Sequence, residues 1–254
     1  VWRVACVRTC VCECSSLTPP GVSSLHIAHP DTDNIVLSRV SSDGTIAWVL
    51  SGDALDSTHY NERVSDMDLD PMQGLAAIAG STDDAMFGCR TGQLAIPCMS
   101  SFLALAQFEN PSSPPFVLAK AHIGGHGLQT TATSVTVSGI GATVMAGSTQ
   151  RLEDLGNLIF GSNTNTLIGP NVSLTVNMEA NETAWLASYN QHSGELRAEW
   201  VATFVAVGDG HVVVHAVAAA GGDVVVVGEA PVSGLKAARW TREKHESMGV
   251  HAPQ

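Results

Sequence analysis

The sequence predicts an all-β protein built from repeated four-stranded units, on three observations. One pattern occurs three times, at residues 33–82, 101–149 and 182–230. In every copy, short apolar runs alternate with turn-forming glycine, proline, asparagine and serine, which is typical of strands joined by tight turns. From the end of the first expected strand to the glycine of the closing motif, the copies span 40, 39 and 39 positions, while the connections between copies differ in length. A constant unit with variable connections indicates a structural repeat.

Each copy is expected to contain four strands. The third strand of the first copy alternates, with Met67 and Leu69 on one face and Asp66, Asp68 and Asp70 on the other, so the carboxylates are expected to face solvent. The fourth strand holds small or branched apolar residues and is expected to be buried on both faces. The expected ranges are 35–40, 102–108 and 185–189 for the first strand, 46–50, 116–123 and 196–207 for the second, and 75–79, 142–146 and 223–227 for the fourth.

Four strands in a unit of about 40 residues is the period of a β-propeller blade. The predicted fold class is therefore a β-propeller, or a partial propeller, of four-stranded antiparallel blades. The matching pieces of this chain are DNIVLSRVSSDGTIAWVLSGD, MDLDPMQGLAAIAGST, FLALAQF, HIGG, MAGST, WLASYNQHSGELRAEW and VVVVGEA. In these segments the chain resembles the bacterial-type β-propeller repeat (SBBP-like) family, and the resemblance implies the same fold.

The repeat divides the chain into three parts. Residues 1–24 form a cysteine-rich segment, a candidate remnant of a preceding blade; residues 25–234 hold the three blades; and residues 235–254 are expected to be a polar tail. Within that tail, Leu235–Trp240 could open another first strand. Three blades cannot close a ring, because the smallest usual propellers have about four. The apolar strand Val224–Val227 would then lie at an open end. We expect further blades of a longer parent, or a partner chain, to cover the outer faces.

Composition narrows the classes of partner. Of the 254 residues, 44% are hydrophobic and only 14% are charged, which suits repeats that pack against one another. The net charge of −12, with only 12 lysines and arginines, argues against nucleic acid and anionic membranes as partners. The longest apolar stretch, 212–227, is interrupted by Gly221, Gly222 and Asp223, so no membrane span is predicted.

The six cysteines fall into two groups. Cys89 and Cys98 lie in the connection after the first copy and are expected to form a disulfide that closes a small surface loop. For the N-terminal cluster, disulfides are favoured and zinc is the alternative, because C-x3-C-x-C-x-C is not a usual zinc spacing and no nearby His completes it. The members of this cluster are Cys6, Cys10, Cys12 and Cys14.

Two N-glycosylation sequons begin at Asn171 and Asn181, in the longest connection between copies. Such a connection is expected to be exposed. Together with an even number of cysteines, the sequons favour an extracellular or cell-surface location.

Candidate metal ligands do not combine into a site in the sequence. His211 and His215 are four positions apart, which on a strand separates them by roughly 13 Å, too far to chelate one ion. Asp53, Asp56 and Glu62 share the longest loop of the first copy and could hold a cation loosely. His122 and His126 flank a strand-end glycine pair and have no adjacent carboxylate or thiol. His26 and His29 precede Pro30-Asp31, and a metal site is equally disfavoured there. We therefore predict no metal ligands and no cofactor.

No catalytic motif is recognisable either. The sequence contains no G-x-S-x-G and no G-x-x-x-x-G-K-[ST] motif, and Gly139-Ile140-Gly141 lacks the third glycine of a dinucleotide fingerprint. Trp48, Trp185 and Trp200 fall on expected strands, where packing is the favoured role and stacking on sugars the alternative.

The first hypothesis for function is a non-enzymatic extracellular propeller module. It would act as an interaction scaffold or as a structural building block of a cell-surface assembly, with protein or glycan partners. The alternative is a carbohydrate-binding or carbohydrate-active propeller with a site at the mouth of the channel. That alternative requires acidic or aromatic residues from several copies to converge, and Asp53, Asp56, His126 and Asp209 are the candidates.

Overall fold

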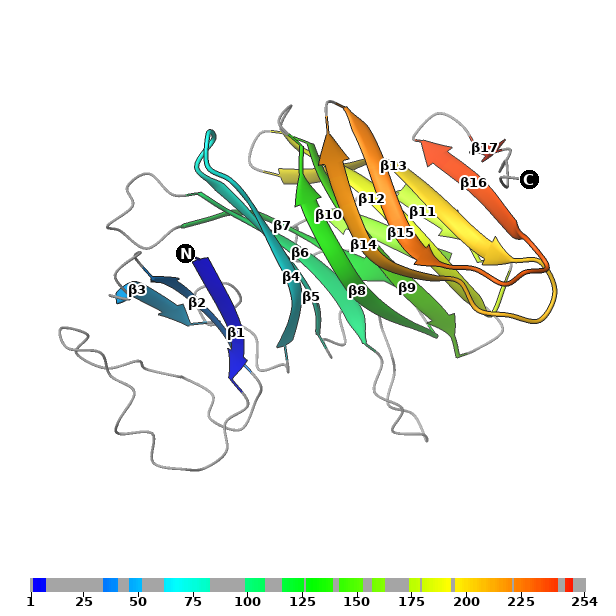
Figure 1. The fold of residues 1–254 in the computed structure, drawn as a ribbon, viewed down its shortest axis with the longest axis horizontal. Helices are drawn as coiled ribbons and strands as arrows, with labels where there is room; N and C mark the ends of the chain where they lie inside the picture. The colour runs from blue at the N-terminus through cyan, green and yellow to red at the C-terminus, as the bar shows by residue number, and fades with distance from the viewer. Residues whose placement is uncertain are drawn as a thin grey trace.

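The structure is a computed structural model, and all of its described secondary structure is β. It describes residues 2–7, 34–40, 46–51, 62–82, 99–107, 116–125, 127–138, 142–152, 157–162, 174–178, 180–192, 195–220, 222–241 and 245–248. These residues form strands and no helix, and every strand pair is antiparallel (Figure 1). The prediction of an all-β protein with antiparallel sheets is confirmed.

The strands follow the order of the repeat. They are β1 (Trp2–Val7), β2 (Asn34–Val40), β3 (Ile46–Ser51), β4 (Glu62–Asp70), β5 (Leu75–Thr82), β6 (Ser100–Gln107), β7 (Phe116–Gly124), β8 (Leu128–Val137), β9 (Ala142–Arg151), β10 (Asn157–Ser162), β11 (Leu174–Asn177), β12 (Glu182–His192), β13 (Glu195–Ala206), β14 (Val213–Ala220), β15 (Asp223–Glu229), β16 (Leu235–Thr241) and β17 (His245–Met248). The first copy supplies β2 to β5, the second β6 to β9, and the third β12 to β15.

The strands assemble into four sheets (Figure 1). One sheet has the order β1-β2-β3, and a two-stranded sheet consists of β14 and β15. The two large sheets have six strands each, in the orders β11-β10-β7-β6-β5-β4 and β17-β16-β13-β12-β9-β8. No sheet closes on itself among the described strands.

Each large sheet combines strands from two copies, which corrects one prediction. The sequence predicted one four-stranded sheet per copy, at 33–82, 101–149 and 182–230. Instead, the last two strands of one copy pair with the first two of the next, as β4-β5-β6-β7 and β8-β9-β12-β13. The physical reason is a steric match across the copy boundary. Gly80 lies opposite Phe102, and Gly147 lies opposite Trp185, so a residue without a side chain makes room for a ring on the adjoining strand.

A hairpin extends each large sheet at its other edge. β10 and β11 follow the second copy and pair with its second strand, β7, while β16 and β17 follow the third copy and pair with its second strand, β13. The prediction that residues 235–254 form a polar tail is therefore wrong for the described residues 235–241 and 245–248. Ala237 is buried and Trp240 packs against the main core, so β16 covers apolar surface that a polar tail would leave exposed.

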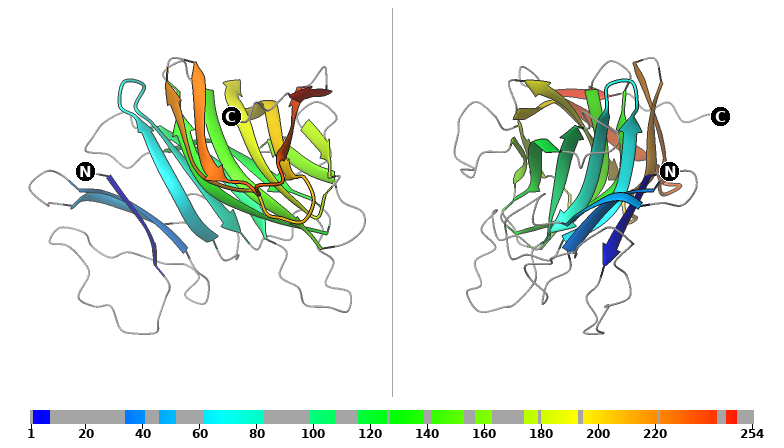
Figure 2. Two further views of the ribbon diagram at one scale, coloured as in Figure 1. Left: turned by 45° about the vertical axis from the view of Figure 1, so that its right-hand side comes forward. Right: turned by 90° about the vertical axis from the view of Figure 1, so that its left-hand side faces the viewer.

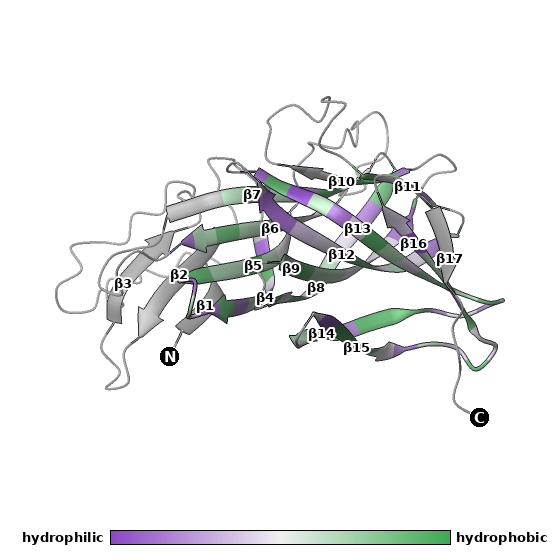
Figure 3. Cartoon of the chain, turned by 90° about the horizontal axis from the view of Figure 1, so that it is seen from above, coloured by the Kyte–Doolittle hydropathy of each residue, from purple (hydrophilic) through white to green (hydrophobic). Residues whose placement is uncertain are grey.

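The large sheets pack face to face around the main hydrophobic core. Trp185 of β12 is fully buried, and its ring meets Phe160 of β10, in the other large sheet, edge to face at a centroid distance of 5.5 Å. Its indole N–H donates to Thr149 at 3.0 Å. Packing is thus the role of Trp185, as the sequence favoured. A smaller core lies between the second large sheet and the β14–β15 hairpin, which forms a layer of its own (Figure 3).

Carboxylates on β4 join the two large sheets at their edges. Asp66 Oδ2 accepts hydrogen bonds from the Ser134 hydroxyl at 2.7 Å and the Val135 N–H at 3.0 Å, both on β8. Asp68 Oδ2 accepts from the Thr136 hydroxyl at 3.0 Å and the Val137 N–H at 2.8 Å, also on β8. The expectation that these carboxylates face solvent is wrong. They satisfy the outward N–H groups of the edge strand β8, because that edge faces β4 in the packed sheets.

Candidate interaction site

The fourth strand of the repeat occurs in two environments. In the first two copies it is largely buried: β5 is buried along nearly its whole length, and residues 143–147 of β9 are buried. This agrees with the prediction of burial on both faces. In the third copy, β15 is exposed at every residue but Val224, which is half-buried. The same apolar pattern therefore forms a core strand twice and a surface strand once.

Exposed valines gather on β15 and beside it. Val225 and Val227 expose 58% and 59% of their surface, and Val226 exposes 36%. Val207, directly after β13, and Val232, in the loop after β15, are also exposed. That loop folds back, since the Val207 N–H donates to the Gly234 carbonyl at 3.1 Å. The orange hairpin and this loop lie at the surface beside the green strands in Figure 2. A concentrated apolar surface of this kind is typical of interaction sites.

The backbone of β15 is paired along only one of its edges in the described part of the chain. β15 pairs with β14, whereas the equivalent strands β5 and β9 pair on both sides, with β4 and β6 and with β8 and β12. An unpaired edge presents a row of N–H and C=O groups that can bind another extended chain. Valines and a free edge on the same strand make β15 the candidate interaction site.

The pairing of β14 with β15 reproduces the equivalent pairs in detail. In all three copies, a register shift adds one residue to the third strand directly beside the closing glycine. The shifts lie between Val64 and Asp66, between Ala132 and Ser134, and between Val214 and Ala216. The closing glycines are Gly80, Gly147 and Gly228. Because bulge and glycine coincide each time, β14–β15 is a correctly formed half of the same four-stranded unit.

Two glutamate–histidine pairs involve β14 or the residues just before it. The Nδ1 atom of His211 is hydrogen-bonded to Glu182, and both side chains are accessible to solvent. The hydrogen bond and the negative charge of Glu182 raise the pKa of His211 above its ordinary value. His215 Nε2 lies 3.0 Å from Glu229 Oε1 across the hairpin. The two histidines thus have separate carboxylate partners.

A polar cavity of about 320 Å³ lies where β14 meets the second large sheet. Its lining carries amide, hydroxyl, carboxylate and imidazole groups, including Gln129, Ser148, Gln150, Glu182 and His211. Side chains of this kind hydrogen-bond to polyhydroxylated molecules, and carbohydrates belong to this class.

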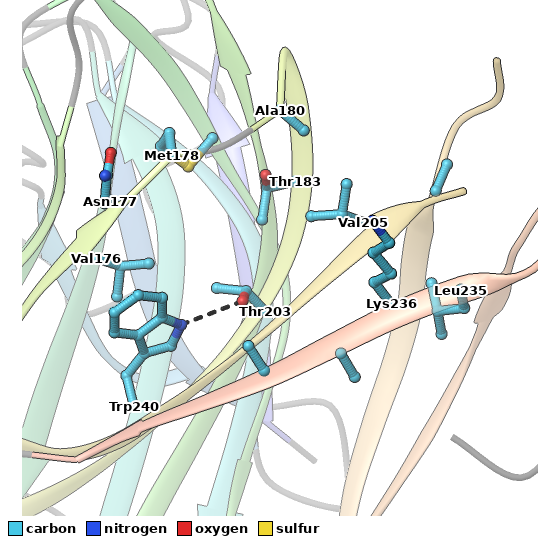
Figure 4. A pocket seen from close by; sticks show the side chains of 13 residues that line it. Val176, Asn177, Met178, Ala180, Thr183, Thr203, Val205, Leu235, Lys236 and Trp240 are labelled. Carbon is cyan, nitrogen blue, oxygen red and sulfur yellow. Dashed lines mark hydrogen bonds between the residues drawn. The ribbon is translucent and has the colours of Figure 1, made fainter. Parts of the chain in front are cut away.

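A larger cavity, of about 540 Å³, lies between β11, β13 and β16 (Figure 4). Its lining is mostly apolar, with Val176, Met178, Val205 and Trp240, and Lys236 adds a cation. The Trp240 indole N–H donates to the Thr203 hydroxyl at 3.3 Å, as the dashed line in Figure 4 shows. This hydrogen bond fixes the ring as one wall, so the cavity fits a small, largely apolar molecule.

Many site residues singled out in the sequence lie outside the described residues. These are Cys10, Cys12, Cys14, Asp53, Asp56, Cys89, Cys98, His126 and Asn171. Cys6 lies on β1 and Glu62 on β4. The disulfide between Cys89 and Cys98 and the acidic loop therefore stay predictions. Asn181 is described and exposed, immediately before β12. Asp209 is exposed in the loop between β13 and β14.

Two general features of the described residues bear on partners. No group of three or more His, Cys, Asp or Glu side chains in these segments could hold a metal ion. In the same part of the chain, no helix is long and apolar enough to cross a membrane.

Sequence reasoning located β15 but could not assign its exposure. The run Val224–Val227 signals a strand buried on both faces, and only the absence of a neighbour on one side reverses that expectation for β15. The sequence does carry a signal for the inter-sheet role of Asp66 and Asp68, because the hydroxyl residues Ser134 and Thr136 occupy the same repeat positions in the second copy.

A comparison with protein-family models and with curated proteins found no match for this chain.

Proposed function

We propose that this protein is a non-enzymatic extracellular module of the β-propeller type that acts as an interaction scaffold, or as a building block of a cell-surface assembly. Successive four-stranded units stacked face to face, with the third strands β4, β8 and β14 side by side, support a propeller-like arrangement. The resemblance of the repeat to the bacterial-type β-propeller family supports it as well.

The main support for this proposal is the exposure of β15 and its unpaired backbone edge. This strand has the composition of a core strand, with four consecutive valines, yet three of them are exposed and one backbone edge is unpaired in the described residues. Burying one valine side chain stabilises an association by about 1.5–3 kcal/mol at most. A partner that covers β15 would gain this apolar burial together with a ladder of main-chain hydrogen bonds.

The extracellular location rests on separate support. Asn181 begins a sequon and its side chain is exposed, as attachment of a glycan requires. Six cysteines in a chain of 254 residues suit an oxidising compartment. The measurement is mass spectrometry of protein secreted from a glycosylating host, with N-glycosidase treatment. We expect a glycan at Asn181 and fewer free thiols than cysteines.

The scaffold function is tested by selection of binding peptides. A displayed library of random ten-residue peptides, a length of about one strand, is selected on the full chain. We expect selected peptides to bind the wild type and to lose binding to the double variant Val225→Lys/Val227→Lys, whose charges resist burial. The control is Val232→Lys, a more exposed valine outside the strand. If no selected peptide discriminates between the double variant and the control, β15 is not an interaction site.

The polar cavity beside His211 supports a second candidate function, the binding of carbohydrate. Its test is a glycan array probed with the wild type and with Gln150→Ala, which removes an amide from the lining. Loss of a glycan signal in this variant, with retention in Val225→Lys/Val227→Lys, would favour the carbohydrate function. Equal signals in both variants and the wild type, or no signal at all, would count against it.

A further inference from the structure

We infer that the free edge of β15 binds an antiparallel β-strand whose aromatic side chain covers Gly228. The inference rests on the proposed scaffold function and names the chemistry of the partner: a polypeptide segment of the type that β6 and β12 supply to the two large sheets.

The two strand pairs that already join neighbouring copies show the same register at the closing glycine. In the β5–β6 pair, Gly80 lies opposite Phe102, and in the β9–β12 pair, Gly147 lies opposite Trp185. Both partner strands run antiparallel to the closing strand. The closing glycine of the repeat is thus matched each time by an aromatic residue on the strand that completes the sheet.

The match between glycine and aromatic residue has a steric reason. A Cβ atom added at Gly80 would lie 2.5 Å from Cζ of Phe102, and one added at Gly147 would lie 2.7 Å from Cη2 of Trp185. The ring of the partner strand therefore occupies the space where a side chain of the closing strand would otherwise stand. Phe102 is 7% exposed and Trp185 is fully buried, so each ring is a major part of the packing at the boundary.

Gly228 of β15 is equivalent to these two glycines. It lies beside the same bulge, and the three atoms nearest to an added Cβ all belong to the backbone of β14. The backbone of the third strand thus approaches the closing glycine in the third copy as it does in the first and second. Among the described residues, an aromatic ring contributes to the three atoms nearest an added Cβ at Gly80 and at Gly147, but not at Gly228.

Two nearby candidates for the partner strand are disfavoured. The next strand along the chain, β16, pairs with β13 and stands in the position that β10 holds on β7. A second copy of β15 would have to pair with itself, and a strand of this sequence pairing antiparallel in the centred register places Asp223 opposite Glu229. Like charges directly opposite one another destabilise an antiparallel pair. The partner is instead a strand of different sequence.

The existing pairs also give the expected register. If the β9–β12 register is transferred to β15, the aromatic residue lies opposite Gly228, and small or apolar residues lie opposite Val226 and Val227, as Ala187 and Leu186 lie opposite Met145 and Ala146. A synthetic peptide with the sequence of β12, ETAWLASYNQH, is therefore a suitable probe.

The experiment measures the binding of this peptide to the full chain. Fluorescence anisotropy of the labelled peptide gives affinity, and hydrogen exchange read by mass spectrometry locates the site. We expect slower exchange in residues 223–229 on binding, and affinity at least about tenfold lower for the peptide with Trp185→Ala. A peptide that is N-methylated at the alternate backbone nitrogens that face β15 in this register, with all side chains kept, should not bind, because it lacks the donors on the edge that pairs.

Variants of the protein test whether the peptide binds at β15. Val225→Lys/Val227→Lys should bind the peptide more weakly than Val232→Lys, since only the first pair lies on the strand. Binding without protection of residues 223–229 overturns the inference, as does self-association of the chain through β15 in light scattering. Equal affinities for the tryptophan and alanine peptides overturn the aromatic match alone. The scaffold function is judged separately, by the selection of random peptides.

Discussion

At the scale of single residues, glycine positions decide which strands meet. Gly147 illustrates this, because Trp185 and the carbonyl of Thr131 both lie against the place where its side chain would be. Protein interiors are packed too densely to absorb an extra methyl group between a ring and a backbone. The closing glycine is therefore required by the packing of its neighbours and not by its own backbone conformation.

The substitution Gly147→Ala tests this requirement. We expect it to lower the free energy of unfolding by about 3 kcal/mol, because the new methyl group forces the ring or the strand to move. The control is Gly208→Ala, where an added Cβ meets nothing within 4 Å and only the φ of +82° opposes the change. We expect this control substitution to lower the free energy of unfolding by about 1 kcal/mol. Equal losses in urea unfolding of the two variants would show that the ring contact is unimportant.

A second residue of interest is Tyr189, which is fully buried and whose hydroxyl has no hydrogen-bond partner among the described residues. Burial raises the pKa of Tyr189 well above its ordinary value, because the phenolate loses its hydration. The folded protein therefore keeps the proton at a pH where the unfolded chain releases it. Stability contributed by this difference is present below about pH 10 and is lost as the pH rises further.

The variant Tyr189→Phe should change this pH dependence. At pH 7 we expect unfolding free energy to be unchanged or up to about 1 kcal/mol higher, because an unpaired buried hydroxyl is removed. Above about pH 10 its stability should fall less steeply than that of the wild type. Urea denaturation at several alkaline pH values measures both effects. A steeper fall in the variant would contradict the assigned role of the buried phenol.

At the scale of elements, the edges of sheets are covered by carboxylates as well as by strands. Asp66 and Asp68 accept both backbone and hydroxyl donors of β8, so two sheets are joined without sharing a strand. The link continues toward β14, since the Val217 N–H donates to Ser134 at 3.3 Å. Three strands at equivalent positions of the repeat are thereby connected side by side.

Replacing these carboxylates should loosen the contact between sheets. We expect Asp66→Ala and Asp68→Ala each to lower stability by about 1–3 kcal/mol, because a backbone N–H and a hydroxyl lose their acceptor. The control is Asp209→Ala, at an exposed aspartate. Its free energy of unfolding should stay within about 0.5 kcal/mol of the wild-type value. A double-mutant cycle of Asp66→Ala with Ser134→Ala isolates the coupling. A coupling energy of zero would mean that the two side chains do not interact in solution.

At the scale of the whole molecule, local stability should follow the pairing of strands. β5 and β9 are paired on both edges and largely buried, whereas β15 is paired with β14 and exposed. Amide groups in strands with few buried contacts open at low free energy. We expect the amides of residues 223–229 to exchange faster than those of residues 75–82 and 142–151. Native-state hydrogen exchange of the free chain checks this order, and similar protection of all three strands would contradict the exposed state of β15.

The sequence by itself determined the all-β class and the strands of the three copies, but not β1, β10, β11, β16 or β17. Period-2 alternation, short apolar runs and turn residues define a strand locally, because they reflect side-chain direction and backbone conformation over a few residues. The fourth strand and its glycine were predicted in all three copies for this reason. The same local signals account for the antiparallel, helix-free character of the described chain.

Only the tertiary structure decided which strands are neighbours. Backbone donors and acceptors are the same in every strand, so the sequence of a strand says little about which edge it joins. Pairing across the copy boundary depends on the contact of Gly80 with Phe102 and of Gly147 with Trp185, residues far apart in the sequence. The exposure of β15 and the hydrogen bonds of Asp66 to β8 likewise follow from which strands are neighbours. Both depend on long-range packing, which composition and spacing do not encode.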